Sequence, residues 1–172
     1  MSGSDEGQRI LGSLGASNGA GVVRMEDRFD TDVDDVWAAI TEPQRLARWL
    51  GEVDGELRVG GTYRFHFTTS GAEGTGRVEE CEPPRRFLVR HGIERPEAHV
   101  IEVTLEADGD QTILVMEQRG MPLTHIAAYG AGIQIHIEDL GAHLAGRETE
   151  GDADARWSEL ESGYAPLAAD VG

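Results

Sequence analysis

The apolar residues of this chain change their spacing along the sequence, from helical to alternating near residue 52 and back to helical beyond residue 130. In the middle segment Tyr63, Phe65 and Phe67 alternate with polar residues, which is typical of a strand with one buried face. The last long segment instead carries one continuous apolar stripe at helical spacing, made of Ile133, Ile137, Leu140 and Leu144. A chain with these two patterns is expected to fold as a sheet with one apolar face, covered by a single amphipathic helix.

The order of the patterned segments predicts an α+β fold. A first strand is expected at residues 22–29, followed by two short helices that start at Thr31 or Asp32 and at Pro43. Further strands are expected at residues 63–67, 76–81, 87–91, 100–107 and 112–119, with a tight turn at residues 108–110. We therefore predict a curved antiparallel sheet of about six to seven strands around a long C-terminal helix that ends near Gly146.

The two ends of the chain differ in composition from this body. Residues 1–21 are rich in Gly and Ser, and we interpret them as a flexible N-terminal arm with one helical turn at Ile10, Leu11 and Leu14. The folded domain is expected over residues 22–146. An acidic linker and a short helix around residues 156–164 are expected in the final segment, residues 147–172.

The charge and the single cysteine limit the classes of partner. The formal net charge is −17 and all 15 basic side chains are arginine, so binding to a nucleic-acid backbone is disfavoured. The use of arginine without lysine fits a GC-rich coding sequence, whereas the acidity fits adaptation to high salt or a basic protein partner. No apolar run is long enough to span a bilayer, no signal peptide is evident, and Cys81 has no partner for an internal disulfide. We expect a cytoplasmic protein that binds neither nucleic acid nor membrane.

Six segments of the sequence together resemble a known superfamily. They are residues 32–43, 46–49, 59–63, 74–78, 82–87 and 139–144. In their order and spacing they resemble the SRPBCC (START-like, Bet v 1-like) superfamily, and within it the branch related to the activator of the heat-shock-protein-90 ATPase. The resemblance covers roughly residues 22–146; one departure is Ile133, where many relatives carry tryptophan.

The resemblance implies a helix-grip fold with an apolar cavity for lipids, polyketides or other hydrophobic molecules. It implies no cofactor and no shared catalytic motif. Some members are polyketide cyclase-like enzymes or hydrolases, and the eukaryotic namesake is a co-chaperone. A likeness of fold supports binding better than it supports any particular reaction.

The direction in which each side chain faces predicts the wall of that cavity. Tyr63, Phe65 and Phe67 are expected to point inward together, because the opposite face carries Arg64 and His66. The same period of two predicts the inward residues of the other strands, and the apolar stripe predicts those of the long helix. The second short helix is expected to cover the open end. The predicted lining residues are Trp49, Tyr63, Phe65, Phe67, Glu80, Val89, His91, Ile101, Val103, Leu114, Met116, Gln118, Ile133, His136 and Ile137.

Two members of this set, Glu80 and Gln118, are polar groups expected inside an apolar space. Each would either hydrogen-bond within the protein or orient a ligand, and a buried Glu80 with a raised pKa is also a candidate general base. The six histidines lack the spacing of a metal site, and Cys81 lacks the basic surroundings of a nucleophile, so neither a metal site nor a catalytic residue is assigned.

Three functions remain open from the sequence. The leading hypothesis is a domain that binds or carries a small hydrophobic molecule, without an assured activity. The second is a cyclase- or hydrolase-like enzyme that uses an inward acid with His91 or Tyr63. The third is a co-chaperone-like module with a protein partner, which would show a filled core and an exposed apolar patch.

Overall fold

The computed structural model of this chain describes residues 10–69, 71–92, 99–147 and 153–171. Over these residues eight strands and several helices follow one another along the chain. They are β1 (Gly12–Ser17), β2 (Ala20–Phe29), α1 (Val33–Thr41), α2 (Pro43–Trp49), β3 (Gly51–Gly55), β4 (Thr62–Phe67), β5 (Glu73–Glu82), β6 (Arg86–His91), β7 (His99–Asp108), β8 (Gln111–Met121), the 3₁₀ turn η2 (Leu123–His125), α3 (Ile126–Leu144) and α4 (Ala153–Ala169).

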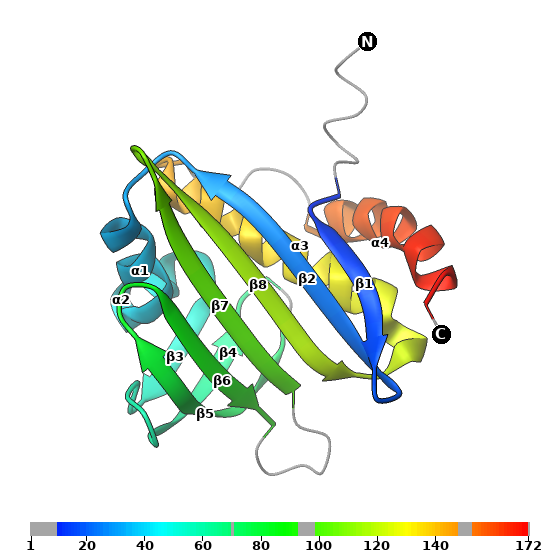
Figure 1. The fold of residues 1–172 in the computed structure, drawn as a ribbon, viewed down its shortest axis with the longest axis horizontal. Helices are drawn as coiled ribbons and strands as arrows, with labels where there is room; N and C mark the ends of the chain where they lie inside the picture. Colours follow the sequence, from blue (N-terminus) through cyan, green and yellow to red (C-terminus); the bar gives the residue numbers. More distant parts are fainter. Residues whose placement is uncertain (1–9, 70, 93–98, 148–152, 172) are drawn as a thin grey trace.

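The described strands form one antiparallel sheet in the order β1-β2-β8-β7-β6-β5-β4-β3. The sheet is curved, and α3 runs across its concave face while α1 and α2 lie at one end (Figure 1). Buried Ile133, Ile137 and Leu140 of α3 contribute to the core beneath the sheet. The predicted α+β helix-grip fold is therefore confirmed, with a strand count slightly above the expected six to seven.

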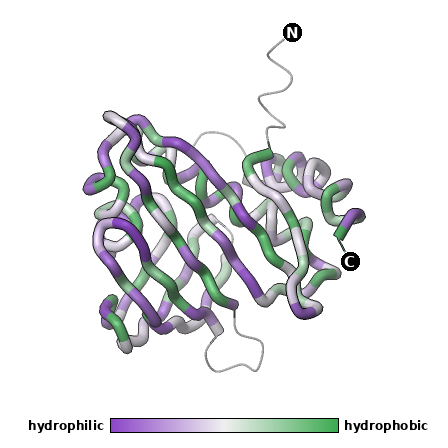
Figure 2. The backbone as a smooth tube through the Cα atoms, viewed as in Figure 1, coloured by the Kyte–Doolittle hydropathy of each residue, from purple (hydrophilic) through white to green (hydrophobic). Residues whose placement is uncertain are grey.

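The alternation along each strand separates an apolar face from a charged one. On β7 and β8, Val103 lies opposite Met116 and Leu105 lies opposite Leu114, all on the concave side. At the alternate positions β7 carries Glu102, Thr104 and Glu106, whereas β8 carries Ile113, Val115 and Glu117. Hydrophobic and hydrophilic colours alternate along much of these strands in Figure 2. The concave face therefore supplies the core, and the convex face meets solvent.

The N-terminal segment is more ordered than the sequence predicted. From Gly12 to Ser17 it forms β1, which pairs with β2 through a two-residue turn at Asn18 and Gly19. Both turn residues have positive φ (55° and 81°), the conformation that Asn-Gly turns of hairpins adopt. The prediction of a flexible arm is wrong for this part of residues 1–21, whereas residues 1–9 lie outside the described residues. The Asn-Gly pair is the signal that the interpretation overlooked.

The C-terminal helix is longer than the predicted helix at residues 156–164. It is α4, and it lies against α3 beside β1 (Figure 1). Glycines on α3 allow the close approach, because a Cβ at Gly130 would lie 3.1 Å from the ring of Tyr164 and one at Gly132 would lie 3.0 Å from Trp157. Residues 148–152 of the predicted acidic linker lie outside the described residues.

None of the described helices has both the length and the apolar character that a membrane crossing requires.

Candidate functional site

A cavity of about 760 Å³ lies between the concave face of the sheet and α3. Strands β4 to β8 form one wall, α3 forms the other, and α1 and α2 close one end. Every residue predicted from the sequence lines this cavity except Glu80. These residues are Trp49, Tyr63, Phe65, Phe67, Val89, His91, Ile101, Val103, Leu114, Met116, Gln118, Ile133, His136 and Ile137.

Glu80 lies on the opposite, convex face, so its predicted inward position is wrong. The register between β5 and β6 shifts between Val78 and Glu80, because β5 contains one extra residue there. This bulge interrupts the period of two, so that Cys81 rather than Glu80 lines the cavity. The carboxylate of Glu80 instead pairs with Arg86, with 3.1 Å between Oε1 and Nη1. A general base at this position is therefore excluded.

Several lining residues were missed by the sequence reasoning. Tyr129 lies one turn before Ile133 on α3, so the helical stripe already pointed to it. His99 lies opposite His91 on the neighbouring strand, and its Nδ1 is 3.3 Å from Nε2 of Gln118. The remaining lining residues that sequence reasoning did not assign include Trp37, Leu57, Cys81, Phe87 and Trp157. Trp157 had no signal of its own, because it reaches the cavity only through the packing of α4 on α3.

Aromatic rings form much of the wall around the ends of β4 and β6. Phe65 and Phe67 stack with 4.7 Å between ring centroids, and His91 stacks on Phe65 at 4.2 Å. Tyr63 lies over Gly76 on β5, where a Cβ would lie 2.5 Å from the tyrosine ring. Glycine at this position therefore leaves the space that the ring occupies. Flat aromatic surfaces of this kind suit a ligand that contains rings.

The hydroxyl of Tyr63 and Nε2 of His91 form a hydrogen bond of 2.8 Å. Burial raises the pKa of Tyr63 far above its usual range. Burial and the neighbouring His99 lower the pKa of His91 to about 4. Both side chains are therefore neutral near pH 7, and the tautomer of His91 sets which of the two groups donates the hydrogen bond. The pair is a polar point in the wall rather than an ion pair poised for proton abstraction.

His136 of α3 is a second polar point and faces Phe67 edge-on, with 5.3 Å between ring centroids. Burial lowers the pKa of His136 to about 4, so its ring is also neutral near pH 7. Its Nε2 atom is buried and has no hydrogen-bond partner within the described part of the chain. Such an atom is costly to leave unsatisfied, by about 1–3 kcal/mol.

Formal charge is nearly absent from the cavity wall. The described lining residues include no arginine and one acid, Glu73, whose side chain is exposed. The arrangement can enclose an uncharged molecule and offer it a few neutral hydrogen-bonding groups. The acid that a cyclase- or hydrolase-like mechanism would take from Glu80 is on the other side of the sheet.

Comparison with known proteins places the chain in a family. Residues 30–145 match the family described as Activator of Hsp90 ATPase homolog 1-like protein. The crystal structure of CalU16 from Micromonospora echinospora is 28% identical, with a TM-score of 0.77, and the match covers 91% of this chain and 96% of that chain. DynU16 is 27% identical with a TM-score of 0.68, over 76% of this chain and 50% of that chain.

A more distant structure shares the fold over nearly the same length. EF2215 from Enterococcus faecalis is 20% identical with a TM-score of 0.70, over 94% of this chain and 95% of that chain. Comparison with curated protein sequences gave no match. The family match spans more than half of the sequence and agrees with the resemblance seen in its motifs. The chain belongs to the Activator of Hsp90 ATPase homolog 1-like family of the SRPBCC superfamily.

Proposed function

We propose that this protein binds a small hydrophobic molecule in the cavity between the sheet and α3. The observation that carries the proposal is a space of about 760 Å³ whose wall is mostly aromatic and aliphatic. Pockets for drug-sized ligands commonly have volumes of about 300–1,000 Å³ and a few polar groups among apolar ones. Membership of a superfamily with a ligand-binding fold supports the same function.

The comparisons also favour a class of ligand. DynU16, which is 27% identical to this chain over a match that covers half of its length, is described as a protein in the dynemicin biosynthetic locus. A product or intermediate of a biosynthetic pathway is therefore the kind of hydrophobic molecule that we propose for this cavity. Binding or carrying such a molecule requires no catalytic residue.

The uncharged dye Nile red tests the proposal. It is expected to bind the folded protein saturably, with one site per chain. Met116→Trp fills the cavity and should weaken dye binding by at least about tenfold, which is about 1.4 kcal/mol. Val115→Trp is the matched control, because the adjacent residue of β8 points to the convex face and its substitution should leave the affinity unchanged.

Two results would contradict the proposal. One is the absence of saturable binding to a protein that circular dichroism shows to be folded. The other is equal binding by the Met116→Trp and Val115→Trp variants. Either result would favour a protein-interaction module instead.

A further inference from the structure

The polar groups of the cavity lie close to one another. His91 and His99 are paired across β6 and β7. The centroid of the Phe67 ring is 6.2 Å from that of His91 and 5.3 Å from that of His136. Tyr129 of α3 meets His99 edge-on at 5.4 Å. One region of an otherwise apolar cavity therefore contains several hydrogen-bonding side chains close together. We call it the polar region; it consists of His91, His99, Tyr129 and His136.

Within the described residues, this polar region provides no arginine to pair with an anionic ligand. The arginines of the surrounding strands, such as Arg90 and Arg119, lie on the convex face and pair with Glu79 and Glu117 there. None of the described lining residues is an arginine. A carboxylate buried here would lose its hydration without gaining a counterion, which costs several kcal/mol. An uncharged ligand avoids that cost.

The buried nitrogen of His136 identifies a group that the ligand should carry. A neutral imidazole has one donor and one acceptor nitrogen, and Nε2 of His136 has no partner within the described residues. The ring lines the cavity, whereas Nε2 itself is covered by neighbouring atoms in this conformation. Rotation about the χ2 bond exchanges the positions of the ring nitrogen and carbon atoms, so a nitrogen can be turned towards a ligand. A ligand hydroxyl, which both donates and accepts, can bond to whichever nitrogen is presented.

We infer, on the basis of the proposed function, that the ligand is an uncharged ring-containing molecule with at least one hydroxyl group, to which His136 hydrogen-bonds. The stacked Phe65 and Phe67 provide the aromatic surface for the rings. The described part of the wall contains no arginine, which disfavours fatty acids and other carboxylates as ligands. His136 is thus a residue that determines specificity rather than one that forms only part of the core.

Three fluorescent probes of nearly equal shape test this inference: 1-pyrenemethanol, 1-pyrenecarboxylate and pyrene. All three tryptophans of the chain, Trp37, Trp49 and Trp157, line the cavity, so a bound pyrene ring should quench their emission by energy transfer. Near neutral pH we expect the alcohol to bind at least about tenfold more tightly than the carboxylate.

The substitution His136→Leu separates the role of the hydroxyl from that of the ring system. It should lower the affinity for 1-pyrenemethanol relative to pyrene by about five- to tenfold, in keeping with one lost hydrogen bond. His66→Leu is the matched control, since His66 is exposed on the outer face of β4, and it should leave that ratio unchanged.

The inference is overturned if the carboxylate binds as tightly as the alcohol, or if His136→Leu leaves the ratio of alcohol to pyrene unchanged. Failure of all three probes with a protein that still binds Nile red overturns it as well. Failure of Nile red too would instead overturn the proposed function itself.

Discussion

At the scale of single residues, burial in and around the cavity shifts the pKa values of ionisable groups, downward for histidines and upward for an aspartate. His91 and His136 are held neutral, each with its pKa lowered to about 4. Asp139 of α3 lies outside the cavity wall and accepts a hydrogen bond of 3.2 Å from Thr69, yet burial raises its pKa to about 6. The two kinds of group therefore change stability with pH in opposite senses, and single substitutions are needed to separate them.

The histidines should make the fold sensitive to acid. Because the pKa of His136 is lower in the folded protein than in the unfolded chain, the unfolded chain binds a proton first as the pH falls. The contribution of His136 to stability is therefore present above pH 6.5 and is lost as the pH falls towards 4. We expect His136→Leu to lessen the fall in the free energy of unfolding across this range. Urea unfolding at several pH values measures it, with His66→Leu as the control. An unchanged pH dependence in His136→Leu would contradict the shift.

Asp139 should act in the opposite direction. Its raised pKa means that the folded state favours the protonated acid, so its contribution is full below pH 3.8 and is lost as the pH rises through about 6. Asp139→Asn keeps an oxygen acceptor for Thr69 and carries no charge. We expect this variant to melt at a higher temperature than the parent near pH 7.5 and at nearly the same temperature below pH 4. A destabilised variant at neutral pH would show that the carboxylate itself stabilises the fold.

At the scale of elements, one buried amide joins β1, α3 and α4. Oε1 of Gln134 accepts hydrogen bonds from the backbone N–H of Leu11, at 3.0 Å, and from the hydroxyl of Tyr164, at 2.6 Å. The amide nitrogen of the same side chain donates to Glu138, at 3.0 Å, and Glu138 also pairs with Arg156 of α4. The residue that leads into β1 and the helix α4, which both lie outside the family match, are thus attached to α3 by a polar centre.

Removal of this centre should be costly. Gln134→Leu leaves the N–H of Leu11 and the hydroxyl of Tyr164 without this acceptor, and we expect a loss of about 1–3 kcal/mol in the free energy of unfolding. Gln44→Leu, at an exposed position of α2, is the matched control and should change stability by less than about 0.5 kcal/mol. Urea unfolding compares the two. Equal stability of both variants would mean that β1 and α4 contribute little to the fold.

Most of the sheet and of the cavity wall could be predicted, because a period of two fixes which residues of a strand share a face. Phe65, Val103 and Met116 line the cavity for this reason. Glu80 was placed wrongly because one bulged residue inverts the alternation after Val78, and a bulge has no reliable sequence signature. Trp157 could not have been found, since its position depends on how α4 docks, whereas β1 had its signal in Asn18-Gly19.

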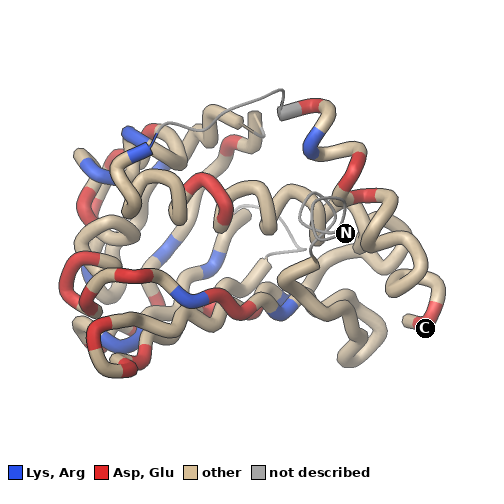
Figure 3. Tube along the Cα trace, turned by 90° about the horizontal axis from the view of Figure 1, so that it is seen from above, with Lys and Arg blue, Asp and Glu red and all other residues tan. Residues whose placement is uncertain are grey.

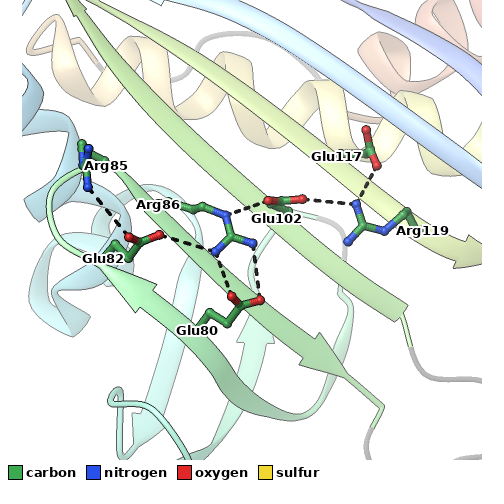
Figure 4. A network of polar contacts seen from close by, with 7 residues as sticks. All are labelled: Glu80, Glu82, Arg85, Arg86, Glu102, Glu117 and Arg119. Carbon is green, nitrogen blue, oxygen red and sulfur yellow. Dashed lines mark hydrogen bonds and ion pairs between the residues drawn. The ribbon is translucent and has the colours of Figure 1, made fainter.

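At the scale of the whole molecule, a network of ion pairs covers part of the convex face. Arg86 contacts Glu80 and, at 2.7 Å, Glu102, which in turn lies 3.3 Å from Arg119 (Figure 4). Acidic residues nevertheless outnumber basic ones, 32 to 15, and they occur on many of the elements drawn in Figure 3, though not on β1. The folded protein therefore bears a net repulsion that local pairing does not cancel.

Salt should therefore stabilise this protein. Raising NaCl from about 0.05 M to about 0.5 M shortens the Debye length, which weakens the net repulsion more than it weakens the exposed ion pairs. We expect the melting temperature to rise by a few degrees. A variant with Glu106→Gln, Asp110→Asn and Glu161→Gln, all exposed, should show a smaller rise. A melting temperature that falls with salt would mean that the ion pairs of the convex face dominate.

The separation of the two faces of each strand has a consequence for how such a protein can diversify. On β8, Met116 faces the cavity while its neighbours Val115 and Glu117 belong to the convex side. A mutation at an inward position can therefore change the shape of the binding site without disturbing the ion pairs outside. Duplicated genes for this scaffold could acquire new ligands one residue at a time, and a designer could follow the same route by randomising only the inward-facing positions of β5 to β8.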